Sequence, residues 1–169
     1  MYGHWQQMLN FLQRRCTDTM KSHSFVIREA KSEDLAALLA LYTHLHEQGI
    51  PDSTEHLAQT WETICNDSSH HIIVCEAEGQ IVASCVCVVI PNLTRNIRPY
   101  ALIENVVTHT QHRKKGYATA CLDFAKEIAV QCNCYKIMLL TGSKNESTLR
   151  FYERAGYNSN DKTGMILWL

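Results

Sequence analysis

The stretch ENVVTHTQHRKKGYA, residues Glu104 to Ala118, decides how the rest of the chain is interpreted. It begins with the apolar pattern of a strand, passes through a short basic loop and leads into an amphipathic helix. Gly116 allows the backbone to turn tightly and to approach a ligand closely. The N–H groups that begin a helix have no partner within it, and they carry a partial positive charge. Together with the basic side chains they suit a pyrophosphate group.

The segment Arg113 to Ala118 has the form Arg/Gln-x-x-Gly-x-Gly/Ala. Two other phosphate-binding patterns, Gly-x-x-x-x-Gly-Lys-Ser/Thr and Gly-x-Gly-x-x-Gly, do not occur in the chain. A basic surface turn that leads into a helix is the alternative interpretation. Placed between an apolar strand and an amphipathic helix, the segment resembles the acyl-CoA pyrophosphate loop of the GNAT superfamily of N-acetyltransferases.

The composition predicts one globular domain. The chain has 169 residues, of which 46% are hydrophobic and 20% are charged, enough for a sizeable core. The 16 Lys and Arg residues nearly balance the 17 Asp and Glu residues, so no overall field attracts nucleic acid or an anionic membrane. No apolar run has the length of a membrane span. We therefore expect no nucleic-acid and no membrane partner.

The eight cysteines favour a reducing compartment over a disulfide scaffold, and we expect a cytoplasmic protein. Four of them lie in apolar, periodic segments, where a free thiol is a small core residue: Cys75, Cys85, Cys87 and Cys121. Cys132-Asn133-Cys134 resembles half of a metal clip, but a structural zinc site needs a second pair, and none is evident in the sequence. We expect no metal.

Residues 1–23 are interpreted as an N-terminal extension, and residues 24–169 as the domain. The extension has apolar residues at the spacing of a short amphipathic helix, namely Trp5, Met8, Leu9 and Leu12. A targeting peptide is an alternative, which the few serines and the Gln-rich face disfavour. An extension that docks on the domain or on a partner fits better.

Beyond the extension, strand and helix patterns alternate in the order β-α-α-β-β-β-α-β-α-β. We expect Ser32 to cap the first helix and Asn145 to cap the last. Asp52 and Glu55 form a capping-box pattern for the second helix. The strands are expected at residues 25–28, 71–77, 80–90, 100–108, 135–140 and 165–169.

This order is that of the GNAT fold, and the resemblance covers residues 25–169. It implies a mixed α/β domain of the α+β type, with a twisted, mostly antiparallel sheet and helices on both faces. In that fold the fourth and fifth strands splay apart after a bulge in the fourth, and pantetheine enters the gap. An amide-bearing pantetheine can satisfy a strand edge that otherwise stays unpaired.

The resemblance implies acetyl-CoA as the acetyl donor. The main chain of Val106, Val107 and Thr108 would pair with pantetheine, and Asn145 would hydrogen-bond the same arm. Tyr152 would lie at the CoA sulfur. The pyrophosphate would be held at Arg113, Lys114, Lys115, Gly116, Tyr117, Ala118 and Thr119. Lys115 is expected to face water.

Two side chains are the catalytic candidates, because amine acetylation needs a base for the ammonium and an acid for the thiolate. The reference pKa of an alkylammonium is ~10.4, and that of a thiol is ~8.5. Tyr152 lies in a segment that resembles the family's Asn…Phe-Tyr-x-x-x-Gly-Phe/Tyr pattern, where the tyrosine is the general acid. Glu104 interrupts an apolar strand and is the candidate base. A pair between Glu104 and Arg28 or Arg98 is one alternative, and His109 as the base is another. For the oxyanion we expect a backbone N–H near Val107.

The sequence predicts an enzyme that moves an acetyl group to a primary amine of a small molecule through a ternary complex. Ile103-Glu104-Asn105 and Cys134-Tyr135-Lys136 resemble the glucosamine-6-phosphate N-acetyltransferase branch, which carries Ile-Glu-Asp in the fourth strand, so Asn105 is a departure. Arg95 and Arg98 could meet an anionic acceptor. Protein or peptide N-acetylation and a non-catalytic acyl-CoA-binding regulatory domain are alternatives. A homodimer is expected.

Overall fold

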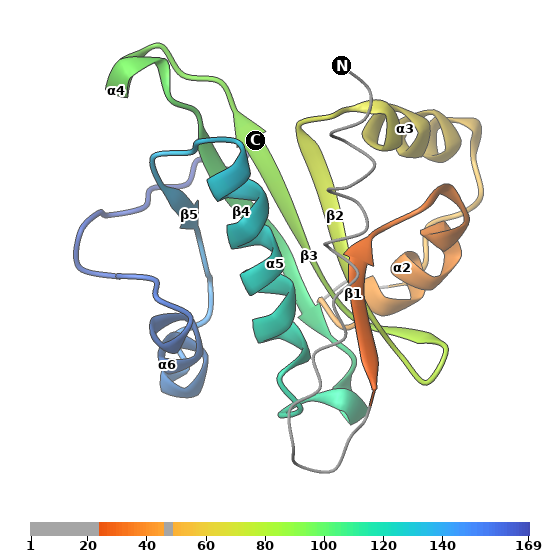
Figure 1. Ribbon diagram of the computed structural model, residues 1–169. Helices are drawn as coiled ribbons and strands as arrows, with labels where there is room; N and C mark the ends of the chain where they lie inside the picture. Colours follow the sequence, from red (N-terminus) through yellow and green to blue (C-terminus); the bar gives the residue numbers. More distant parts are fainter. Residues whose placement is uncertain (1–23, 46–48) are drawn as a thin grey trace.

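A five-stranded sheet forms the centre of the computed structural model, which describes residues 24–45 and 49–169 (Figure 1). The extension expected at residues 1–23 lies outside the described residues. The first four strands pair antiparallel in chain order, and the fifth lies parallel to the fourth. The strands are β1 (Phe25–Glu29), β2 (His70–Ala77), β3 (Gln80–Ile90), β4 (Tyr100–Thr108) and β5 (Ile137–Leu139). The predicted mixed α/β fold is confirmed.

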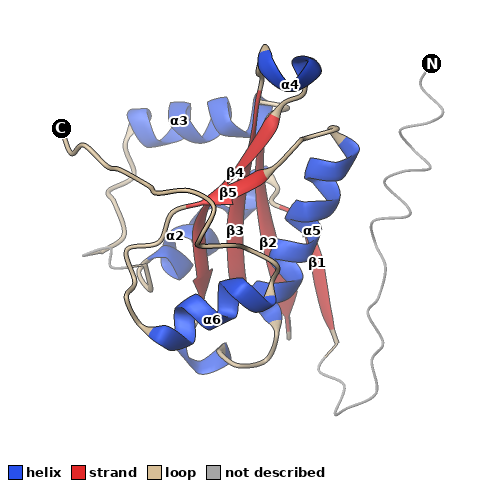
Figure 2. Ribbon diagram, turned by 90° about the vertical axis from the view of Figure 1, so that its left-hand side faces the viewer, coloured by secondary structure: helices blue, strands red, loops and turns tan. Residues whose placement is uncertain are grey.

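Helices cover both faces of the sheet (Figure 2). On one face lies α5 (Tyr117–Gln131), joined by α6 (Glu146–Arg154). On the other face lie α2 (Leu35–Tyr42) and α3 (Glu55–Asn66). Because successive side chains of a strand point to opposite faces, β3 contributes to both layers. Its Cys85 packs toward α5, and its neighbour Val86 packs toward α2. This explains why β3 is apolar along most of its length.

The predicted positions of several elements are confirmed. The bounds of β3 are those expected, and the Glu78-Gly79 turn before it has the positive φ values of 55° and 74° that a tight hairpin needs. Asn145 caps α6, since its Oδ1 accepts a hydrogen bond of 2.8 Å from the Ser147 N–H. Gly156 follows the helix with φ 92°, as a glycine at this position does.

The N-caps expected for the first two helices are wrong. The first helix begins with a 3₁₀ turn, Ser32–Asp34, and Lys31 occupies the N-cap position. The carboxylate of Asp34, the last residue of this turn, accepts a hydrogen bond of 2.7 Å from the backbone N–H of Lys31. The capping side chain therefore belongs to the turn itself. For α3 the cap is Thr54, whose hydroxyl accepts from the Leu57 N–H at 3.1 Å. Thr54 lies one residue before the helix, where the free N–H groups are within reach.

The predicted last strand at residues 165–169 is also wrong. In the described residues the sheet ends at β5, and the five apolar residues have no regular secondary structure and are exposed. A strand forms only against a partner edge, and the chain does not lay this segment along its own sheet. Among the described residues, no helix is both long and apolar enough to span a bilayer.

Candidate active site

A bulge in β4 opens the sheet at its fourth strand. Ser84 of β3 lies opposite Val107, but Val86 lies opposite Glu104, so β4 has one residue more than β3 over this interval. Asn105 takes up the extra length with φ 51°, a left-handed conformation that asparagine tolerates better than most residues. The bulge that the resemblance implied is therefore present at Asn105.

Beyond the bulge, β4 and β5 separate. The two strands pair only between Ala101–Ile103 and Ile137–Leu139. From Glu104 to Thr108, no described strand lies along the edge of β4 that faces away from β3. An unpaired edge of this length offers N–H and C=O groups to an extended ligand.

The hydrogen-bond alternation of an antiparallel pair tells which residues present these groups. The His109 N–H donates to the Val82 C=O across the pair at 2.9 Å. Two residues earlier, the main chain of Val107 therefore points toward β3 as well. The main chain of Thr108, and of Val106 beside the bulge, points toward the gap. Among the three predicted residues, Val106 and Thr108 are thus the better placed.

The loop after β4 has the backbone of an anion site. Gly116 occupies the N-cap position of α5 with φ 85°, and Lys114 also has a positive φ of 64°. The first intrahelical bond runs from the Ala120 N–H to the Gly116 C=O at 3.0 Å. The N–H groups of residues 117–119 are therefore without intrahelical partners and point out of the helix end. The arrangement suits a phosphate group.

The side chains of this loop divide into two groups. Arg113, Lys114 and Lys115 are all exposed around the helix end, so the water-facing position expected for Lys115 is shared by its neighbours. The Nε of Arg113 lies 3.4 Å from the Thr108 C=O, which places its guanidinium beside the β4 edge. Tyr117 is buried, and its ring packs edge-on against Phe25 at 5.2 Å between centroids. Only its backbone can contact a ligand at the helix end.

Tyr152 lies on the face of the sheet that α5 covers. It lies on α6 and packs against the core beneath α5, in contact with Phe151 and Tyr157. Its hydroxyl makes no hydrogen bond within the described residues. Burial raises the pKa of this hydroxyl above its ordinary value of 10.0, and the charge of Glu104 adds to the rise. The group therefore holds its proton throughout the neutral range.

Glu104 approaches from the opposite face. It lies directly across from Val86, whose side chain belongs to the layer under α2 and α3. The alternative pairs are absent from the described residues, because Arg28 binds Asp34 and Glu76 instead. Arg98 donates to the C=O groups of Asn133 and Cys134. The Glu104 carboxylate is exposed and has no cationic partner there.

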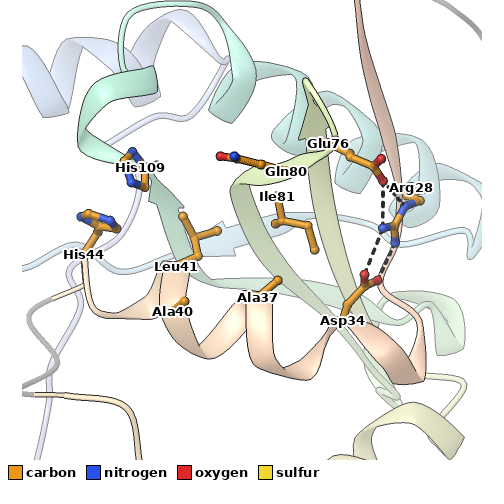
Figure 3. A pocket seen from close by; sticks show the side chains of 11 residues that line it. Arg28, Asp34, Ala37, Ala40, Leu41, His44, Glu76, Gln80, Ile81 and His109 are labelled. Carbon is orange, nitrogen blue, oxygen red and sulfur yellow. Dashed lines mark hydrogen bonds and ion pairs between the residues drawn. The ribbon is translucent and has the colours of Figure 1, made fainter.

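His109 borders a different space, a cavity of about 500 Å³ between α2 and the β2–β3 hairpin (Figure 3). Its ring lies edge-on to the ring of His44, with 4.4 Å between the ring centroids. Its Nδ1 accepts a hydrogen bond from the Gln111 N–H at 3.3 Å. At the other end of the cavity Arg28 lies between Asp34 and Glu76 (Figure 3). Neither Glu104 nor Tyr152 lines this cavity.

Arg95 and Arg98, the residues suggested for an anionic acceptor, both contact other parts of the domain. The two hydrogen bonds of Arg98 fasten the start of β4 to the loop before β5. Arg95 lies over the ring of Tyr135, at 5.8 Å from its centroid. The turn that carries Arg95, α4 (Thr94–Ile97), has left-handed backbone angles that the sequence did not indicate.

The class of protein follows from comparison with known families. The chain matches the acetyltransferase (GNAT) family over residues 32–157, well over half of its length, and it belongs to this family. It is a GNAT N-acetyltransferase, and hence an acyltransferase enzyme.

Solved structures carry the same fold. A protein from Agrobacterium tumefaciens named as an acetyltransferase is 37% identical with a TM-score of 0.79, and the match covers 85% of this chain and 99% of that one. Glucosamine-6-phosphate N-acetyltransferase from Arabidopsis thaliana is 25% identical with a TM-score of 0.74, over 85% and 97%. AAC(6')-Iy in complex with the bisubstrate analogue CoA-S-monomethyl-acetylneamine has a TM-score of 0.72 at 15% identity, over 88% and 99%.

Proposed function

We propose that the protein transfers an acetyl group from acetyl-CoA to a primary amine of a small molecule, directly and within a ternary complex. One observation carries the proposal. The unpaired edge of β4 runs from the start of α5 to the bulge, Glu104 lies on the α2 face of the sheet beside the bulge, and Tyr152 lies on the α5 face. A nucleotide thioester needs this order of contacts, because its diphosphate, amides and thioester follow one another along an extended arm.

In the proposed reaction the two side chains have opposite tasks. Glu104, directly or through a water molecule, takes a proton from the acceptor ammonium. The amine nitrogen bonds to the thioester carbonyl carbon, the carbon–sulfur bond breaks, and the Tyr152 hydroxyl gives its proton to the departing thiolate. The raised pKa of Tyr152 keeps that proton available. The second proton that the nitrogen loses as the amide forms passes through solvent to the Tyr152 phenolate and restores its hydroxyl. The oxyanion would be stabilised by the N–H groups that point into the gap beside the bulge, rather than by the N–H of Val107, which points toward β3.

The acceptor class is inferred from one relative and from the residues beside the bulge. The Arabidopsis relative acts, by its name, on glucosamine-6-phosphate, and residues 103–105 resemble its branch except at Asn105. Because Asn105 occupies the bulge with a positive φ, its backbone role does not require a carboxylate. An amino-sugar phosphate is therefore one candidate within the broader class of small amines.

The test is thiol release from acetyl-CoA with a panel of amines: glucosamine-6-phosphate, polyamines, amino acids and an N-terminal peptide. We expect turnover with a small amine and a loss of kcat on the order of 100-fold or more in Tyr152→Phe. Binding of CoA, measured by calorimetry, should stay unchanged in this variant. Tyr135→Phe is the matched control, because Tyr135 lies beside Lys136 and Arg95 rather than at the gap.

Three outcomes would overturn the proposal. Binding of CoA without turnover on any amine, unaltered by Tyr152→Phe, would indicate a regulatory domain. Turnover on the peptide alone would indicate protein N-acetylation. Absence of any CoA binding would remove the donor itself.

A further inference from the structure

The cavity between α2 and the β2–β3 hairpin has no part in the proposed reaction, because neither Glu104 nor Tyr152 lines it. Its volume of about 500 Å³ lies within the range of pockets that hold small organic molecules. Its lining comes from segments far apart in the sequence, which are β1, α2, the hairpin and the residue after β4 (Figure 3). The two ends of the cavity and its middle differ in chemistry, and together they indicate what it can bind.

One end of the cavity has a net negative charge. The single positive charge of Arg28 lies between the carboxylates of Asp34 and Glu76 (Figure 3). Both oxygens of Asp34 accept hydrogen bonds from Arg28, and one of them also accepts from the Lys31 N–H. Glu76 binds Arg28 through Oε2 alone, so its Oε1 has no hydrogen bond within the described residues. This oxygen can accept a charge-assisted hydrogen bond from an ammonium group.

The opposite end of the cavity offers neutral hydrogen-bonding groups. The Nδ1 of His109 accepts from the Gln111 N–H, so in the neutral imidazole the proton is on Nε2, which is then a donor. The side-chain amide of Gln80 extends toward this end, and it makes no hydrogen bond within the described part of the chain (Figure 3). An imidazole N–H and an amide suit a neutral oxygen such as that of a hydroxyl group.

The middle of the cavity is apolar. Ala37, Ala40 and Leu41 of α2 line it from one side, and Ile81 of β3 lines it from the other (Figure 3). Two of these residues are alanines, whose small side chains leave room between the helix and the hairpin. Small-molecule sites are typically built in this way, from mostly apolar walls and a few polar groups that fix the orientation of the ligand.

We propose that this cavity binds a small amino alcohol. The ammonium group lies at Glu76, a short hydrocarbon body lies along α2, and the hydroxyl group lies at His109 and Gln80. The site is separate from the proposed acceptor site, so binding here needs no acetyl-CoA. The free oxygen of Glu76 selects the cation, and the neutral groups at the other end select the hydroxyl over a second charge.

The test titrates the full chain with ω-aminohexanol in the absence of acetyl-CoA and follows the backbone amides of isotope-labelled protein by NMR. We expect saturable shifts that concentrate at Gly79, Gln80 and His109, which line the cavity. Hexanol lacks the ammonium group and hexylamine lacks the hydroxyl group. Each should bind about fivefold or more weakly than ω-aminohexanol, because each leaves one polar end of the cavity without a partner.

Two variants of the protein test the same site from the other side. Glu76→Gln removes the charge but keeps an oxygen that can accept from Arg28, and it should weaken binding about 10-fold or more. Ala37→Leu fills the apolar middle and should abolish binding. Ala36→Leu is the matched control, because Ala36 is exposed on the same helix but does not line the cavity, and it should bind as wild type does. Circular dichroism checks that each variant is folded.

Several results would overturn this assignment. Equal affinities for the three compounds would show that the two ends of the cavity recognise nothing. Shifts around Glu104 that disappear in Glu104→Gln would place the amino alcohol at the proposed acceptor site instead. Unchanged binding in Ala37→Leu, or no saturable shift with ω-aminohexanol, would remove the cavity as its site. None of these results bears on acetyl transfer, which the Tyr152→Phe experiment tests independently.

Discussion

Arg28 joins three segments of the domain through its guanidinium. It binds the Asp34 carboxylate in a bidentate pair, at 2.5 Å from Nη1 and 3.0 Å from Nη2, and it also binds Glu76 at 3.0 Å. The three residues belong to β1, to the turn before α2 and to β2. With two carboxylates around one guanidinium, the group is saturated, and its role is to hold α2 on the sheet.

We predict that Asp34→Asn lowers the free energy of unfolding by about 2 kcal/mol at pH 7, because it removes a charge-assisted pair. The hydrogen bond from Arg28 lowers the pKa of Asp34 below its ordinary value of 3.8 in the folded state. The contribution is thus present above that value and is lost as the pH falls through the folded pKa. In urea titrations the difference between wild type and variant should shrink below about pH 4.

Glu33→Gln is the control for this change. Glu33 lies next to Asp34 but is exposed, with Lys31 4.0 Å away, so its replacement should have little effect. A difference between Asp34→Asn and wild type that stays constant down to pH 2 would contradict the role given to Asp34.

Single residues could be predicted from the sequence where their task is local. Asn145 and Gly156 were identified because a cap and a left-handed helix end depend on neighbours only a few positions away. The partner of Asp34 could not be found in this way, since it depends on the strand that brings Arg28 beside it. The same holds for His44 and His109, which are 65 positions apart and come together only in the fold.

At the scale of elements, the end of α5 depends on one backbone conformation. We predict that Gly116→Ala costs about 1–2 kcal/mol in the free energy of unfolding, because a residue with a Cβ is strained at φ 85°. A methyl group here meets no atom within 4 Å, so any effect comes from the backbone and not from a clash. Binding of CoA, followed by calorimetry, should weaken in parallel as the N–H groups of the helix end turn away.

Gly142→Ala provides a matched control for this glycine. Gly142 also has free space where a Cβ would lie, but it has no positive φ. It should leave both stability and CoA binding unchanged. Equal effects of the two substitutions would show that flexibility of the chain, rather than the left-handed turn, matters.

Elements with a strong periodic pattern were predicted well, and those that depend on neighbours were not. The buried face of α5, with Leu122, Ala125 and Ile128, follows directly from its helical spacing. The apolar segment Met165–Leu169 has an equally strong pattern, yet it forms no strand within the described residues. Its pattern shows only that it is to be buried, and the partner edge is set by the tertiary or quaternary structure.

At the scale of the whole domain, the described residues place four thiols in the core, closed to solvent. Cys75, Cys85, Cys87 and Cys121 are each 0% exposed, whereas Cys65 and Cys132 are exposed. We predict that a disulfide reagent at pH 8 labels the two exposed thiols at once and the four core thiols only after denaturation. Replacement of Cys65 and Cys132 by Ser should remove two equivalents from the fast phase. Labelling of core thiols at the same rate in the native protein would contradict this arrangement.

The same thiols set an alkaline limit to stability. Burial raises the pKa of Cys75 and of Cys87 to about 12, from 9.0. Because the folded value lies above the unfolded one, the protonated thiols stabilise the fold fully below pH 9. That contribution is lost as the pH rises from 9 toward 12. Urea titrations between pH 8 and 11 should show a steady decline, which Cys75→Ala should make shallower.

The extra residue at Asn105 has a consequence for how this protein can change. The opening in the sheet depends on the number of residues in β4 between Glu104, which lies opposite Val86, and Val107, which lies opposite Ser84. It depends only weakly on which residues these are. Substitutions around the opening can therefore alter chemistry while the architecture persists. Deletion of a single codon at Asn105 would let β4 pair regularly with β3 through this interval and remove the bulge, while Glu104 would stay opposite Val86. The geometry of the candidate site therefore depends on the number of residues in this part of β4.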